Sequence, residues 1–153
     1  MSKDPKVTPI LFDSYIVAIK NSVGTKMFRN YYALVDREQH DIMKNGDLSC
    51  AFYVSSVLRI FDLINEVHRT VDGAVSDMKK SRWRKIKKPK IGAVLVWEKK
   101  DFGDVYHKHI GFYIGDSKAI SNSAQKKTPV IHNWTFQNTR KVEATYWHSR
   151  LAK

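Results

Sequence analysis

The sequence is poor in cysteine, glycine and proline. Cys50 is the only cysteine among 153 residues, and there are 7 glycines and 4 prolines. A single cysteine excludes an internal disulfide, and it also excludes the cysteine-rich clusters that hold structural zinc. In contrast, 42% of the residues are hydrophobic and 12% are aromatic. This length and composition are typical of one globular domain and not of a disordered chain.

The sequence also lacks a long apolar run. No stretch approaches the roughly 20 residues that are needed to span a bilayer. The first residues are polar and charged, and the apolar part that follows, ILFDSYIVAI, is interrupted by Asp13 and Ser14. This is not the layout of a signal peptide. As written, the chain predicts a cytoplasmic protein without a membrane span, unless a leader has been removed or another export route is used.

Acidic residues are few: 15, against 27 lysines and arginines, which gives a net charge of +12. Such a charge attracts polyanions, either nucleic acid, an anionic membrane or an anionic cell-wall polymer. The basic residues are densest in KKSRWRKIKKPK, residues 79–90. We favour a solvated linker that also tethers the protein electrostatically. The alternative is a nucleic-acid patch in which Trp83 stacks on bases. The candidates for polyanion contact are Lys79, Lys80, Arg82, Arg84, Lys85, Lys87 and Lys88.

The spacing of apolar residues predicts helices first and strands later. Helical spacing indicates helices over residues 10–20, from Cys50 to about residue 66, and over 71–80. Alternation then predicts strands at 91–98, 107–115, 118–124, 129–136 and 141–148. This order is typical of an α+β domain, with N-terminal helices packed on an antiparallel sheet of about five strands. We expect a single domain over residues 1–153, with a helical extension at 1–44 and a core at 45–148.

The cysteine lies in NGDLSCAFYVSSVL, residues 45–58, where a turn precedes a helix. Asp47 or Ser49 can cap that helix. A thiol in the first helical turn meets the positive end of the helix dipole and free backbone amides, and both favour the thiolate. Cys50 is therefore a candidate nucleophile. The alternative is that it simply begins the buried face of the helix, as free cysteines often do.

A nucleophilic cysteine needs a base and a third group that orients the base. His107 and His109 begin the strand HKHIGFYIG and lie on one face of it. His109 leads directly into a regular strand, so it is the candidate base. The alternatives are two histidines exposed at a strand end, or a metal pair. No spacing points to a third metal ligand, so we expect neither a metal nor a cofactor.

The third group is expected on the next strand. If the turn at Asp116-Ser117 has two residues and no bulge, Asn122 lies on the face that carries His109. A bulge would shift the register by one residue and bring Ser121 to that face instead. Asn122 is the first candidate and Ser121 the alternative. The segment SNS could also be a polar strand end without a catalytic role.

Three segments together resemble a known family. GDLSCAFYV, PKIGAVLVWE and HKHIGFYIGDSKAISNS resemble the motifs of NlpC-type cysteine peptidases of the papain-like superfamily, and they are similar to the related CHAP amidases. The resemblance covers about residues 45–125 and is most specific in HIGFYIG. It implies a papain-like fold in which Cys50 is the nucleophile, His109 the general base, and Asn122 or Ser121 the group that orients His109. The implied reaction is hydrolysis of amide bonds in peptidoglycan peptides through an acyl-enzyme.

The sequence departs from the family pattern beside the thiol. Leu48-Ser49-Cys50-Ala51 replaces the usual Asp-Cys-Ser-Gly, and Gly92-Ala93 replaces Gly-Asp. Two other functions are therefore kept. One is a non-catalytic basic module on the same fold that binds nucleic acid or an anionic cell-wall polymer. The other is acyl transfer by the same Cys–His pair, with an amine or alcohol in place of water.

Overall fold

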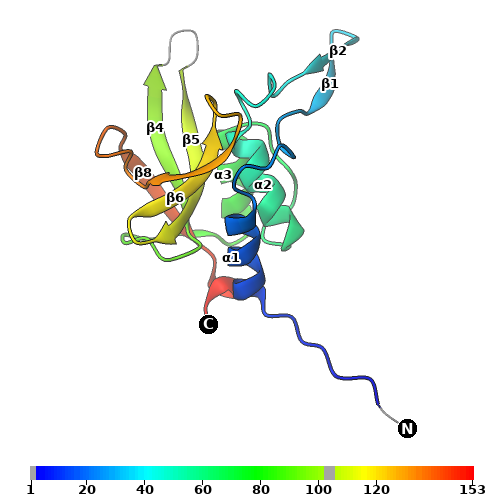
Figure 1. The fold of residues 1–153 in the computed structure, drawn as a ribbon, viewed down its shortest axis with the longest axis vertical. Coiled ribbons are helices and arrows are strands. Elements are labelled where there is room, and N and C mark those ends of the chain that lie inside the picture. The colour runs from blue at the N-terminus through cyan, green and yellow to red at the C-terminus, as the bar shows by residue number, and fades with distance from the viewer. Residues whose placement is uncertain (1–2, 102–105) are drawn as a thin grey trace.

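The chain combines α-helices with antiparallel β-strands, so the predicted α+β class is confirmed. The computed structural model describes residues 3–101 and 106–153. In this part of the chain the helices are α1 (Leu11–Asn21), α2 (Cys50–Ile60) and α3 (Val71–Lys80), and a short 3-10 helix, η1 (Ser149–Leu151), lies near the C-terminus. Figure 1 shows α1, α2 and α3 grouped beside the sheet. None of the helices described has the length and apolar character that crossing a bilayer requires.

The described strands form two antiparallel sheets. A hairpin of β1 (Tyr32–Val35) and β2 (Glu38–Asp41) projects from the molecule (Figure 1). The main sheet has the order β3-β8-β4-β5-β6-β7. Its six strands are β3 (Arg84–Lys85), β4 (Val94–Asp101), β5 (Tyr106–Gly115), β6 (Lys118–Ser123), β7 (Thr128–Asn133) and β8 (Val142–Trp147). The prediction of about five strands is therefore one too few, because the two-residue strand β3 lies within the basic run.

Hydrophobic burial holds α2 against the sheet. Tyr53, Val54 and Leu58 on this helix are fully buried. The Tyr53 ring meets Phe112 of β5 edge to face at 5.6 Å between centroids, and Tyr15 of α1 meets the same ring at 5.9 Å. Aromatic pairs in this geometry add to the stabilisation that burial provides. As a result, α2, whose first residue carries the thiol, lies against β5 and β6.

Helix α2 ends six residues before the predicted end at residue 66. The backbone of Asp62 has a φ of 56°, which is a left-handed conformation that stops a helix. The amide of Leu63 then donates back to the carbonyl of Leu58 at 2.9 Å, which closes the helix end. Leu63 and Ile64 are still buried, at 1% and 3% exposure. The apolar spacing therefore continued into a buried loop, which periodicity alone does not distinguish from another helical turn.

A second, smaller cluster covers the face of the sheet opposite the main core. Leu95, Trp97 and Ala119 are buried there, and Trp134 and Phe136 pack against them. The Trp97 indole N–H donates to the carbonyl of Trp134 at 2.8 Å, which ties the segment after β7 to β4. His109 pairs with Trp97 across β4 and β5, so its ring belongs to this cluster.

Candidate active site

The four residues predicted for the site line one cavity of about 640 Å³. Cys50 comes from the start of α2, His109 from β5, and Ser121 and Asn122 from β6. Segments about 60 to 70 residues apart in the sequence therefore meet at one place. The cavity wall also contains His107, His132, Phe136 and Arg140, which the sequence analysis did not assign to a catalytic site.

The Cys50 side chain is buried, with 6% exposure, at the first residue of α2. Burial raises the pKa of the thiol from 9.0 to about 11, although the backbone N–H groups of Ile110 and Ala51 and the charge of Arg140 act in the opposite direction. Cys50 therefore lies at the start of a helix, as predicted. The desolvation of the thiolate, however, raises the pKa more than the backbone N–H groups and Arg140 lower it. The resting group at neutral pH is the thiol.

A chain of hydrogen bonds links three side chains from three strands. The His109 Nε2 atom lies 2.8 Å from Ser121 Oγ, and the same oxygen lies 2.7 Å from Nε2 of His132 on β7. The Nδ1 atom of His132 lies 2.7 Å from the carbonyl oxygen of Asn133. Because a carbonyl only accepts, Nδ1 of His132 must carry the proton and donate it.

The hydrogen bonds of His132 determine the tautomer of His109. With Nδ1 protonated, a neutral His132 presents a bare Nε2, which accepts from the Ser121 hydroxyl. The Ser121 oxygen is then free to accept from Nε2–H of His109. The remaining ring nitrogen of His109, Nδ1, is left unprotonated and can act as a base.

The environment keeps both imidazoles neutral. Burial lowers the pKa of His109 well below 6.5, and the positive charge of Arg140 lowers it further. Burial also lowers the pKa of His132. The ring of His132 stacks on Phe136 at 4.2 Å between centroids, and Trp97 lies against both imidazoles at 5.2 and 5.6 Å. These aromatic rings fix the orientation of the two bases.

Ser121, and not Asn122, lies next to His109, so the first-choice register is wrong. The turn has the predicted two residues, and Gly115 pairs with Lys118. A bulge follows immediately, because Tyr113 pairs with Ala119. This one-residue shift turns Asn122 to the other side, where its Nδ2 donates to the carbonyl of Gly46 at 2.8 Å. Asn122 therefore anchors the loop that leads into Cys50.

Arg140 brings a buried positive charge to the cavity. Its side chain is 7% exposed, and it donates from Nε to the carbonyl of Glu98 and from Nη2 to the carbonyl of His107, each at 3.0 Å. Its charge lowers the pKa of the Cys50 thiol. Arg140 comes from the segment between β7 and β8. It belongs to no motif that the sequence displays, so only the fold reveals it.

Two other polar groups near the thiol are buried without a hydrogen-bond partner among the described residues. They are the Ser49 hydroxyl and the Nδ1 atom of His107. His107 lines the cavity. Its ring therefore offers a polar group to a molecule that enters, since buried polar atoms are otherwise almost always paired.

The basic run does not form a stacking surface. Trp83 is only 2% exposed, and its indole N–H donates to the carbonyl of Leu63 at 2.7 Å, so it cannot stack on a base. The alternative interpretation of this run, a nucleic-acid patch in which Trp83 stacks on bases, is therefore contradicted. Lys79 and Lys80 end α3, and Arg84 and Lys85 form β3. The run thus joins the helical half to the sheet.

Within the described ranges, no group of three or more histidine, cysteine or acidic residues is arranged to hold a metal ion. Comparison with known proteins adds no assignment: no family model matches the chain, and no curated protein is similar to it.

Proposed function

We propose that the protein is a papain-like cysteine hydrolase that cleaves amide bonds. The observation that carries this proposal is the hydrogen-bond chain from His109 through Ser121 to His132, in a cavity that also contains the Cys50 thiol. The hydrogen-bond chain leaves Nδ1 of His109 as a free base, and a thiol nucleophile requires such a base.

The reaction begins with a neutral pair. His109 Nδ1 takes the proton from Cys50 Sγ as the sulfur forms a bond to the amide carbonyl carbon. The amide C–N bond then breaks, and the departing amine takes the proton from His109. Water, deprotonated by the same nitrogen, cleaves the resulting thioester and restores the thiol.

Two features of the site favour the charged species that form along this path. The backbone N–H of Cys50 is at the start of α2, where no carbonyl four residues earlier accepts it, so it can donate to the oxyanion. The buried Arg140 guanidinium adds positive potential beside the sulfur. In this role Ser121 orients His109, and Asn122 positions the loop before the nucleophile.

The substrate that we propose is a peptidoglycan peptide, on the basis of the family resemblance in residues 45–125. The test is incubation of the protein with purified peptidoglycan, with mass spectrometry of the newly formed amines. We expect Cys50→Ala and His109→Ala each to lower the rate by at least about 100-fold, because both remove a group that takes part in bond making.

His40→Ala is the matched control, because this histidine is exposed on the hairpin, 53% accessible and away from the cavity. Its rate should stay within twofold of the wild-type rate. Wild-type protein that binds peptidoglycan and releases no new amine would contradict the proposal and favour a binding module on the same fold.

A further inference from the structure

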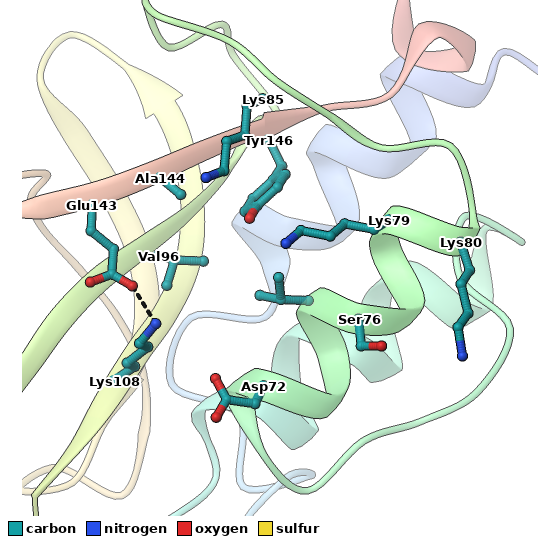
Figure 2. Close-up of a pocket in the computed structure, with 11 residues that line it drawn as sticks. Asp72, Ser76, Lys79, Lys80, Lys85, Val96, Lys108, Glu143, Ala144 and Tyr146 are labelled. Atoms are coloured by element: carbon teal, nitrogen blue, oxygen red, sulfur yellow. Dashed lines mark ion pairs between the residues drawn. The ribbon is translucent and has the colours of Figure 1, made fainter.

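A second cavity of about 610 Å³ lies between α3 and the strands (Figure 2). Helix α3 forms one wall. Val96 of β4, Lys108 of β5 and Tyr146 of β8 belong to the opposite wall, and Lys85 of β3 completes the lining. Lys108 and His109 are neighbours on β5, and alternation directs their side chains to opposite faces. The lining of this cleft shares no residue with the lining of the candidate active site.

The cleft gathers positive charge from several elements. Its lining contains four lysines and two carboxylates. Figure 2 shows the ammonium groups of Lys79, Lys85 and Lys108 approaching the cleft from α3, β3 and β5. Lys108 pairs with Glu143 at 2.5 Å, and this contact raises its pKa, so it stays charged. In the part of the chain that the structure describes, Lys79 and Lys85 form no ion pair.

Hydroxyl donors and an apolar floor accompany the lysines. Tyr146 is 3% exposed at the bottom of the cleft, and burial raises the pKa of its phenol, so the hydroxyl keeps its proton. The Ser76 hydroxyl lies on the α3 wall (Figure 2). Val75, Val96 and Ala144 supply apolar surface beside these polar groups. Small-molecule sites combine apolar walls with a few placed polar groups in this way.

We propose that this cleft binds a phosphate group carried by a larger molecule. A phosphate monoester has a charge of about −1.5 to −2 and three acceptor oxygens, so one group can engage several ammonium and hydroxyl donors together. A carboxylate has one charge and two oxygens, and it satisfies fewer of them. Lysines suit phosphate as compact point charges. The remaining volume and the apolar floor accommodate the body that carries the phosphate.

The test compares two double variants with the same change in net charge. All four lysines are exposed, but only Lys79 and Lys85 line the cleft. K79Q/K85Q therefore removes two ammonium groups from the lining, whereas K87Q/K88Q removes two from the same basic run outside it. Calorimetric titration of the full chain at low salt uses inorganic pyrophosphate as the probe. We expect K79Q/K85Q to weaken binding at least tenfold and K87Q/K88Q less than twofold, with circular dichroism showing that both variants fold.

Titrations with other ligands identify the class of molecule that the cleft binds. A six-nucleotide single-stranded DNA that binds more tightly than pyrophosphate, with the same loss in K79Q/K85Q, would support the site and show that the phosphate belongs to a polymer. Equal losses in the two double variants would overturn the proposal, since they would indicate diffuse charge attraction. Citrate that binds as tightly as pyrophosphate would overturn the choice of phosphate. So would wild-type protein that binds neither phosphate probe.

Discussion

The base in the candidate active site depends, at the residue scale, on a serine hydroxyl. Ser121 is only 2% exposed and bridges His109 and His132. Ser121→Ala removes the acceptor for His109 Nε2–H, so the ring is no longer held in the tautomer with a free Nδ1. We expect kcat for amide hydrolysis to fall by roughly 10 to 100-fold, with KM little changed, because general-base catalysis requires the correct protonation state. Steady-state kinetics measures both constants.

Ser14→Ala is the control for this prediction. Ser14 is exposed on α1 and does not line the candidate active-site cavity. Its kcat should stay within twofold of wild type. A Ser121→Ala variant with wild-type kcat would show that His109 needs no orienting group and would remove the main support for the proposed mechanism.

Some residues of the site could be predicted from the sequence, and others could not. Cys50 and His109 could be placed by local pattern, because one starts an apolar helix and the other starts an alternating strand. The choice between Ser121 and Asn122 depended on a bulge near Ile114, and no sequence signal specifies it. The raised pKa of Cys50 could not be predicted either. The helix dipole, which lowers this pKa, can be inferred from the local sequence, whereas the burial that raises it depends on packing by the whole fold.

At the element scale, periodicity located the segments that bury a face. The helix at 10–20, the helix at 71–80 and the strands of the main sheet after β3 were all predicted near their observed positions. The hairpin β1–β2 was not, because most of its residues are exposed and its sequence has no apolar alternation. Strand β3 was hidden for a similar reason. It consists of two exposed basic residues that pair with β8.

Close approach of β5 and β6 gives a prediction at this scale. A Cβ added at Gly111 would lie 2.7 Å from both the carbonyl oxygen of Ile120 and Cβ of Ser121. Gly111→Ala must therefore push β6 away from β5 and move Ser121 from His109. We expect the free energy of unfolding to fall by about 1–3 kcal/mol, as overpacked cores do, and activity to fall with it. Urea denaturation measures the first effect.

Ile131→Val is the comparison for Gly111→Ala. Ile131 lies on the edge strand β7 and is 53% exposed. Its replacement should change the free energy of unfolding by less than about 0.5 kcal/mol. If Gly111→Ala had an effect as small as this, the two strands would have room that the structure does not show.

The whole molecule presents two different cavities whose linings share no residue. The candidate active site collects neutral imidazoles, aromatic rings and a thiol, whereas the cleft beside α3 collects lysines. The fold thus places some of the many basic residues in a cleft and others outside it. Lys79 and Lys85 line a cleft, while Lys87 and Lys88, which are also exposed, lie outside its lining. Net charge alone could predict attraction to anions but not this separation.

Acid stability of the molecule should depend on Asp77, which joins α3 to the loop after α2. Its carboxylate accepts from the backbone N–H groups of Asn65 and Glu66 at 3.2 and 2.9 Å, and it lies 2.6 Å from Nε2 of His68. Burial alone would raise the pKa of Asp77, but these hydrogen bonds outweigh it and lower the pKa from 3.8 to about 2. The ionised carboxylate therefore stabilises the folded state.

The sign of the pH dependence follows from this lowered pKa. The stabilisation is fully present above about pH 4 and is lost as the pH falls toward 2, and it amounts to about 2 kcal/mol. In Asp77→Asn the free energy of unfolding should be lower at neutral pH, and it should fall by about 2 kcal/mol less than in wild type between pH 4 and 2. Urea denaturation at a series of pH values measures the difference.

Asp62→Asn is the control, because this carboxylate is 85% exposed, and it should keep the wild-type dependence of the free energy of unfolding on pH. An Asp77→Asn slope equal to that of wild type would assign the acid sensitivity to other groups, and the link between α3 and the preceding loop would then not depend on this charge.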